Sequence, residues 1–313
     1  MMNIVLVGGS GFLGQYLVNE LVANGHQCTV LSRNIERRRE FRLKPATRLV
    51  QANVYDADEL TRRLEGADAV ISMAGILNES GSDGRGFKKV HVELPALIAD
   101  ACTRAGISRL IQVSALNAGK GESRYLASKG EAEAMLLGRS ELDTTIFQPS
   151  VIFGPGDSFF NRFAGLLKFA PIMPLACGNS RMQPVYAGDV AAAVTASLGD
   201  PSTHGKTFEL GGPGIYTLSE LVRFTAASMG KKRWVITLPD WLSRLQGMLL
   251  GLVPGKPLSM DNYRSLQTDN ITSRNGLRYF GIDPASIERK VPAYLGVSTH
   301  QKRLASIRKK ARR

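Results

Sequence analysis

The chain has 313 residues, of which 43% are apolar and 21% charged, and this composition excludes an intrinsically disordered protein. Its three cysteines, Cys28, Cys102 and Cys177, lie far apart, which argues against a disulfide framework or a zinc site and indicates a reducing compartment. The formal net charge is +13, and seven of the basic residues lie in the tail 301–313. We expect that tail to be a solvated appendage or a contact to anionic lipid. No nucleic-acid site is expected there, because no aromatic residue lies among its charges.

The first fourteen residues predict a strand, a glycine turn and a helix that together bind a dinucleotide. An apolar run over 3–7 is followed by glycines at positions 8, 11 and 14, and apolar residues then recur at helical spacing. One glycine permits the tight turn, one lets the backbone approach a pyrophosphate, and one lets the helix pack closely on the strand. The free N–H groups at the helix N-terminus then face the phosphates. A simple packing turn is the alternative interpretation. The expected cofactor-binding residues are Gly8, Gly9, Ser10, Gly11, Phe12, Leu13 and Gly14.

The end of the second strand, expected over 27–31, selects between the two nicotinamide cofactors. An acidic residue there would bind the ribose 2′-hydroxyl of NAD, whereas an arginine can accept the 2′-phosphate of NADP. The sequence has Ser32, Arg33 and Asn34 at this point. We therefore expect Arg33 to bind the phosphate, and NADP(H) to be preferred over NAD(H). The arginines at 37–39 follow, and they also fit a solvated helix face.

Four further strands are expected to complete a doubly wound parallel sheet. They lie over 47–52, 69–75, 109–114 and 144–148. A helix is expected over 90–105, and the glycine-rich segment 76–89 before it is expected to be a flexible loop near the site. Ligands bind at the carboxyl edge of such a sheet, so residues that follow its strands are candidates for the cofactor site. These candidates are Asn53, Val54, Ala74, Gly75, Pro149 and Val151.

A tyrosine and a lysine four residues apart follow the fifth strand. The spacing puts Tyr125 and Lys129 on one face of a helix, one turn apart. A nearby ammonium lowers the pKa of a phenol, and such a pair can pass a proton to or from a substrate oxygen. We therefore predict a catalytic pair, with an exposed tyrosine on its own helix as the alternative.

The predicted fold is α/β, with a Rossmann domain over 1–215 and a smaller C-terminal α+β lobe over 216–300 that binds substrate. The apolar segment 159–180, which contains two prolines, is expected to contribute to that lobe. Thr217 is expected to begin a helix, because a glutamate follows three residues later in a capping-box pattern.

The most apolar stretch of the chain is 234–253. Apolar residues recur in it at helical spacing and share one face; they are Trp241, Leu242, Leu245, Leu249 and Leu252. The stretch is too short and too interrupted to span a bilayer. Two interpretations remain open: a helix packed on the core of the lobe, or a helix in a membrane interface.

Together these motifs resemble those of an atypical or extended short-chain dehydrogenase/reductase. The resemblance covers 1–215 and rests on the glycine turn, Arg33, Tyr125 with Lys129, and the segment 148–155. Further segments are similar to one branch of the family, which contains the nucleotide-binding accessory subunit of mitochondrial respiratory complex I and its bacterial relatives. Those segments are 238–242, 252–258, 261–262 and 266–270. The resemblance implies a bound NADP(H) and an association with quinone-related membrane machinery.

The resemblance also implies catalytic roles and one departure from the family pattern. Catalytic relatives carry a serine or threonine after the fifth strand, where this sequence has Ala115, and Ser114 lies one residue earlier. A shift of one residue along a strand turns a side chain to the opposite face. The candidate catalytic residues are therefore Tyr125, Lys129 and Ser114, with Lys129 also orienting the cofactor ribose.

Three functions follow from these expectations. The first is an NADPH-dependent oxidoreductase that acts on a small apolar substrate or quinone. The second is a non-catalytic NADPH-binding accessory or assembly protein, peripheral to a membrane complex and docked through 234–253 and the basic tail. The third and weakest is a nucleotide-sugar epimerase. We expect a cytoplasmic protein, or one peripheral on the inner face of the membrane, and no metal site, because the four histidines lack metal-ligand spacing.

Overall fold

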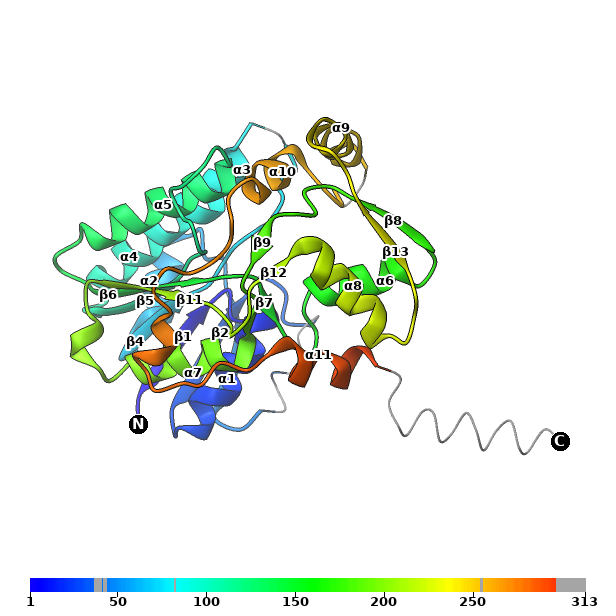
Figure 1. Cartoon of the computed structure of the whole chain (residues 1–313). Helices are drawn as coiled ribbons and strands as arrows, with labels where there is room; N and C mark the ends of the chain where they lie inside the picture. Colours follow the sequence, from blue (N-terminus) through cyan, green and yellow to red (C-terminus); the bar gives the residue numbers. More distant parts are fainter. Residues whose placement is uncertain (37–40, 42–43, 82, 254–255, 297–313) are drawn as a thin grey trace.

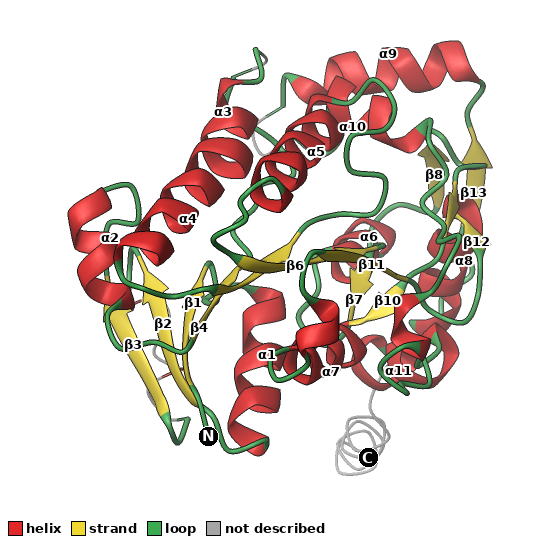
Figure 2. Ribbon diagram, turned by 90° about the vertical axis from the view of Figure 1, so that its left-hand side faces the viewer, coloured by secondary structure: helices red, strands yellow, loops and turns green. Residues whose placement is uncertain are grey.

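A parallel β-sheet with helices on both faces forms the larger part of the molecule, and a smaller lobe packs against one side of it (Figures 1 and 2). The computed structural model describes residues 1–36, 41, 44–81, 83–253 and 256–296. The basic tail 301–313 and the arginines at 37–39 therefore lie outside the described residues.

The sheet has seven strands in the order β11-β6-β5-β4-β1-β2-β3, and every pairing in it is parallel. The direction in which successive strands are added reverses between β1 and β4, which is where ligands bind in open α/β sheets. This arrangement confirms the predicted doubly wound sheet. The strands are β1 (Asn3–Val7), β2 (Gln27–Ser32), β3 (Thr47–Gln51), β4 (Ala69–Ser72), β5 (Arg109–Val113), β6 (Asp143–Pro149) and β11 (Lys206–Leu210).

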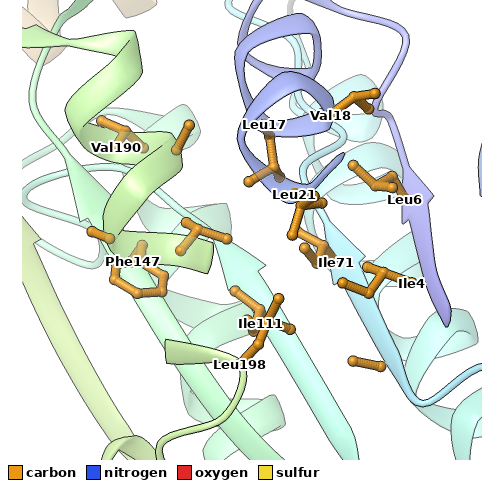
Figure 3. Packing of buried hydrophobic residues seen from close by; sticks show 14 of the residues in the cluster. Ile4, Leu6, Leu17, Val18, Leu21, Ile71, Ile111, Phe147, Val190 and Leu198 are labelled. Carbon is orange, nitrogen blue, oxygen red and sulfur yellow. The ribbon is translucent and has the colours of Figure 1, made fainter. Parts of the chain in front are cut away.

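Both faces of the sheet are buried, because the side chains of each strand alternate between two apolar clusters. Ile4 and Leu6 of β1 join the cluster under α1 (Phe12–Ala23) and α7 (Ala187–Ser197), where Figure 3 shows them packed near Leu17 and Leu21. Val5 and Val7 point to the other cluster. That cluster lies under α2 (Ala57–Leu64), α4 (Leu94–Arg104) and α5 (Arg124–Leu137).

The helix expected over 90–105 has a different start from the predicted one. The chain forms α3 (Arg85–Lys88), then one π-helical turn, η2 (Lys89–Glu93), and only then α4. A π-helical turn contains one residue more than an α-helical turn, and such turns occur frequently at functional sites. This one carries His91, which is buried near the candidate site.

The lobe has its own apolar core, to which α6, α8 and α11 contribute. The capping box predicted at Thr217 is present, since its hydroxyl accepts from the Glu220 N–H and the Glu220 carboxylate accepts from the Thr217 N–H. The helices are α6 (Phe159–Leu167), α8 (Leu218–Ser228), α9 (Asp240–Gly251), α10 (Met260–Leu266) and α11 (Ile287–Leu295). The remaining strands are β7 (Ile152–Phe153), β8 (Ile172–Leu175), β9 (Arg181–Met182), β10 (Val185–Tyr186), β12 (Tyr216–Thr217) and β13 (Trp234–Thr237).

Two 3₁₀ turns, η3 (Pro201–Thr203) and η4 (Gly276–Arg278), complete the described secondary structure. Leu277 of η4 returns to the apolar cluster under α1 and α7, so part of the segment 216–300 packs on the sheet and not within the lobe.

The apolar stretch 234–253 is not one helix. Its first residues form strand β13, and α9 begins only after Pro239. The buried residues of α9 are Ser243 and Gly247, whereas Trp241, Leu245 and Leu249 are exposed. The interpretation that this apolar face packs on the core is therefore wrong. Among the described residues, none of the helices has the length and apolar character needed to cross a membrane.

Candidate functional site

A cavity of about 560 Å³ opens at the carboxyl edge of the sheet, at the point where the strand order reverses. Its walls come from the ends of β1, β2 and β4, the turn before α1 and the segment after β3. This volume lies in the ordinary range for small-molecule and cofactor sites. Ten of the predicted cofactor residues line it: Gly8, Ser10, Gly11, Phe12, Leu13, Gly14, Arg33, Val54, Ala74 and Gly75.

The three glycines of the turn have three different surroundings, which match the three predicted uses. Gly8 has φ +82°, and a Cβ there would lie 2.6 Å from the Ala74 nitrogen. A Cβ on Gly14 would lie 1.8 Å from the Gly9 carbonyl oxygen, so that position holds the helix against the turn. A Cβ on Gly11 would meet only the Gly8 oxygen, at 3.6 Å, which leaves its cavity side open to a phosphate. The turn therefore fits a dinucleotide.

Five of the predicted cofactor residues do not line this cavity, and one of them, Lys129, only reaches its edge. A Cβ on Gly9 would face the Leu6 side chain, and the Asn53 side chain accepts a hydrogen bond from the Tyr55 N–H in a local turn. The carbonyls of Pro149 and Val151 accept hydrogen bonds from Leu116 and Val185 and hold the segments beside β6. Sequence reasoning missed other lining residues, although most flank predicted ones: Val7, Leu31, Ser32, Asn34, Tyr55, Met73, Ile76, Val90 and Leu94.

Arg33 lies at the end of β2, exposed and in the wall of the cavity. The strand itself ends at Ser32, so the position that an NAD-binding carboxylate would occupy carries a hydroxyl. Arg33 is also near Tyr55: burial raises the pKa of that tyrosine, and the guanidinium charge opposes the shift.

The Lys129 side chain is buried and reaches the edge of the cavity near Gly75, where a Cβ would lie 3.6 Å from the Lys129 Nζ. Tyr125 is half-buried one turn earlier on the same helix. Its ring packs edge-on against the buried His91, with the centroids 5.3 Å apart. Lys129 therefore reaches the edge of the cofactor cavity, whereas Tyr125 packs against His91 and does not line the cavity.

His91 has one tautomer that satisfies all its contacts. Its Nε2 accepts a hydrogen bond from the Ile76 N–H at 3.1 Å, so the proton belongs on Nδ1. Nδ1 then donates to the Ser128 hydroxyl at 3.0 Å, and that hydroxyl donates to the Tyr125 carbonyl at 2.8 Å. Burial and the Lys129 charge lower the pKa of His91 to about 3. The imidazole is therefore a fixed neutral support for the helix that carries Tyr125.

The expectation that Lys129 lowers the pKa of Tyr125 is wrong for this structure. Burial dominates and raises the pKa of Tyr125 to about 12, so the phenol keeps its proton. Burial also lowers the pKa of Lys129 to about 8, against an opposing contribution from the Glu133 carboxylate one turn further along the helix. The phenol of Tyr125 is therefore protonated at neutral pH, beside a lysine whose pKa is about 8.

Ser114 is buried at the end of β5, and its hydroxyl is enclosed by protein atoms. Burial raises the pKa of Glu133, and the nearby Ser114 hydroxyl opposes this shift, although its geometry is outside that of a formed hydrogen bond. Gln148 supplies the hydrogen bonds to Glu133, at 2.9 and 2.7 Å. This placement disfavours the predicted contact between Ser114 and a substrate carbonyl.

Asp261, which the sequence analysis named only within a segment similar to the family branch and not as a site residue, binds the N-terminal end of the helix that carries Tyr125. Its carboxylate accepts hydrogen bonds from the Arg124 N–H at 2.7 Å, the Tyr125 N–H at 3.1 Å and the Ser123 hydroxyl at 3.0 Å. A carboxylate at this end of a helix satisfies free N–H groups and complements the helix dipole. Asp261 belongs to α10 of the lobe, so the lobe fixes the start of the helix.

The segment that follows β4, expected to be flexible, is held by the same part of the lobe. The Lys256 ammonium donates to the carbonyls of Glu79, at 2.8 Å, and Gly81, at 2.6 Å, and Asn262 donates to the Leu77 carbonyl. The Glu79 carboxylate in turn accepts from the Gly84 N–H at 2.8 Å. Within the described part of the chain, no cluster of three or more His, Cys, Asp or Glu residues could hold a metal ion.

Sequence comparisons agree with this site. The model of a family described as NAD(P)H-binding matches residues 8–157. A mouse protein named NADH dehydrogenase [ubiquinone] 1 alpha subcomplex subunit 9, mitochondrial, is 31% identical over 293 residues, which cover 90% of this chain and 77% of the relative. A ceramide reductase from Caulobacter vibrioides is 29% identical over 243 residues, which cover 76% of this chain and 74% of the relative.

Solved structures with the same fold include a dTDP-glucose 4,6-dehydratase from Streptomyces venezuelae, with a TM-score of 0.76 at 20% identity over 94% of this chain and 96% of that one. A UDP-glucose 4-epimerase from Thermotoga maritima has a TM-score of 0.75 at 17% identity over 97% of this chain and 100% of that one. The glycine turn fits a dinucleotide, and the family model and the mouse relative match this chain. The chain therefore belongs to the NAD(P)H-binding atypical short-chain dehydrogenase/reductase family that includes the alpha subcomplex subunit 9 of mitochondrial NADH dehydrogenase.

Proposed function

We propose that this protein is an NADPH-dependent reductase of a small apolar carbonyl compound or quinone. The observation that carries the proposal is the Lys129 ammonium at the edge of the cofactor cavity, with Tyr125 one turn away on the same helix and its phenol protonated. The name of the ceramide reductase relative supports an apolar substrate, and the ubiquinone in the name of the mouse relative supports a quinone.

The chain's own residues would hold the cofactor and supply the proton. The turn 8–14 would bind the pyrophosphate through backbone N–H groups, and Arg33 would bind the 2′-phosphate. When bound, NADPH supplies the hydride that reduces the carbonyl carbon. Tyr125 donates its phenolic proton to the carbonyl oxygen, and solvent then restores that proton. The Lys129 ammonium stabilises the phenolate and orients the ribose.

Steady-state NADPH oxidation against a panel of quinones and apolar ketones tests this function. Tyr125→Phe removes the proton donor, and we expect turnover to fall by about 10²- to 10⁴-fold with little change in NADPH affinity. Tyr279→Phe, a change at an exposed tyrosine remote from the cavity, is the matched control and should leave turnover unchanged. Equal turnover in Tyr125→Phe and the control would contradict the proposal.

The preference for NADP(H) is tested separately by binding. Arg33→Asp should weaken NADPH by more than tenfold and NADH much less, because only NADPH carries the 2′-phosphate. Arg48→Asp changes the same charge on the neighbouring strand β3, outside the cavity wall, and controls for net charge. Equal losses for both cofactors would overturn the assignment of Arg33.

A second function, a non-catalytic NADPH-binding accessory or assembly protein, is favoured by one observation. The Ser114 hydroxyl is buried beside Glu133, and Ala115 occupies the family's usual serine position, so a second group to hold a carbonyl is missing from that place. Tight NADPH binding that stabilises the fold, without oxidation by any acceptor, would support this function. The nucleotide-sugar neighbours are under 25% identical and support the fold alone.

A further inference from the structure

One face of the lobe is apolar and exposed over several elements, and we call it the lobe apolar surface. On α9 it consists of Trp241, Leu245, Met248, Leu249 and Leu252. On the outer side of the β8–β13 pair, and just before β8, it consists of Phe169, Ile172, Trp234 and Ile236. The two tryptophans are 67% and 76% exposed, and Phe169 is 87% exposed. Exposed large apolar side chains in such number on neighbouring elements indicate a binding site for a protein or a membrane.

The apolar residues of α9 are exposed because the helix packs on the rest of the lobe through its opposite side. A turn of about 100° per residue places the five apolar residues on one side and Ser243 and Gly247 on the other. The Ser243 hydroxyl accepts from the Cys177 N–H at 3.2 Å, and the side-chain Oε1 of Gln246 accepts from the Ala176 N–H at 3.1 Å. Gly247 packs against Met260 and Tyr263 of α10. The helix therefore buries its small and polar side and presents its leucines outward.

Strand β13 leads directly into α9, as Figure 1 shows. Its side chains alternate: Val235 is buried in the lobe core, while Trp234 and Ile236 face outward. Trp234 lies opposite Ile172 in the parallel pairing with β8, so both strands give apolar side chains to the same face.

Basic residues border this surface. Lys168 is exposed next to Phe169, Lys232 and Arg233 directly precede Trp234, and Arg244 is exposed on α9 beside its apolar residues. The one carboxylate within α9, Asp240, accepts a hydrogen bond from the Tyr263 hydroxyl at 2.8 Å. A second copy docked on this face would bring these positive charges together. An anionic lipid surface would instead attract them, at about 1 kcal/mol for each Lys or Arg near the surface.

We propose that the lobe apolar surface inserts into the headgroup region of a bilayer that contains anionic phospholipids. Tryptophans and leucines would enter the interface, and Lys168, Lys232 and Arg244 would contact lipid phosphates, as in amphipathic interfacial helices. Because α9 packs on α10, and Asp261 of α10 binds the N-terminal end of the helix of Tyr125, a single helix would separate the bilayer from that contact. The inference goes beyond the proposed function and does not depend on turnover.

The experiment uses the full chain with vesicles of phosphatidylcholine alone or mixed with phosphatidylglycerol. Both tryptophans of the protein lie in the lobe apolar surface, so tryptophan emission reports on this face alone. We expect flotation with the mixed vesicles and a blue shift of the emission. The double variant Leu245→Glu, Leu249→Glu should reduce the vesicle-bound fraction at least tenfold. Leu137→Glu, at an exposed leucine on α5, is the matched control and should bind like the unmodified protein.

Circular dichroism and NADPH titration check that the double variant keeps its fold and cofactor site. Flotation of the double variant at the level of the control would overturn the proposal. Flotation without a blue shift, abolished by deletion of 301–313, would assign lipid binding to the basic tail and also overturn it. A concentration-dependent dimer that the double variant abolishes would assign the surface to a second copy of the chain instead.

Discussion

The cofactor edge of the sheet and the C-terminal lobe both position groups around the cavity, but they do so by different kinds of contact. The cofactor cavity is built from short segments that each follow a strand, and its apolar residues lie in two buried clusters. The lobe acts through single side chains, Lys256 and Asp261, that reach elements more than 130 residues earlier in the chain. It also leaves its most apolar helix face exposed. The cofactor cavity is therefore built from short segments of the chain, whereas the contacts at the N-terminal end of α5, the helix of Tyr125, come from residues far away in the sequence.

The largest effect that separates the two regions is expected at the glycine turn. Gly8→Ala combines a left-handed φ of +82° with a Cβ 2.6 Å from the Ala74 nitrogen. We expect a loss on the order of 2 to 5 kcal/mol in the free energy of unfolding, with NADPH affinity reduced more than tenfold. Gly25→Ala, with φ +79° and open space around its Cβ, isolates the conformational part. Denaturant unfolding of both variants measures the difference, and equal losses would show that the close approach at Gly8 is unimportant.

A second, smaller effect is expected from His91, which is hydrogen-bonded both to the segment after β4 and to α5. Its pKa is lowered to about 3 in the folded protein, against about 6.5 in the unfolded chain, so the unfolded state binds the extra proton first as pH falls. The stabilisation is complete above pH 6.5 and is lost progressively towards pH 3. Between pH 7.5 and 4.5 this loss is about 2 to 3 kcal/mol. His91→Gln removes the titration, so its stability should fall less over this range; parallel curves from chemical denaturation would contradict the assignment.

The smallest effect tests the contribution of the lobe. Asp261→Ala removes the carboxylate that binds the first N–H groups of α5, whose N-cap residue Ser123 remains, and Asp56→Ala removes the N-cap carboxylate of α2, which carries no candidate catalytic residue. Each should reduce the free energy of unfolding by about 1 kcal/mol. Only Asp261→Ala should also lower kcat, with NADPH affinity retained, because it loosens the start of the helix that holds Tyr125. Equal kcat in the two variants would show that the lobe does not position the tyrosine.

The sequence predicted the part of the site whose residues lie close together in the chain. A glycine turn between a strand and a helix has its chemistry in seven consecutive residues, and all but Gly9 of them line the cavity. Arg33 was predictable for the same reason, since the end of β2 must reach the cofactor edge. The pairing of Tyr125 with Lys129 also needed only helical spacing.

The rest of the site depends on three-dimensional contacts that a short sequence pattern does not reveal. His91 was not recognised as a support for Tyr125, because the π-helical turn that carries it has no signature in the sequence. The pKa of Tyr125 was predicted with the wrong sign, since helical spacing gives the neighbouring charge but not the burial that outweighs it. The outward direction of α9 follows from contacts of Ser243 and Gly247, which hydrophobic periodicity ignores.

The carboxylate of Asp261 has a consequence for how the protein is made. During synthesis, residues 123–125 leave the ribosome 136 or more residues before Asp261, the residue that binds them. The glycine turn and most strands of the sheet are then already present, so a nascent chain has the parts needed to hold a dinucleotide while the helix of Tyr125 still lacks its N-terminal partner. A chain that ends before α10 would thus retain the residues of the nucleotide pocket, while the start of the helix that carries Tyr125 still lacks the Asp261 carboxylate from the last third of the polypeptide.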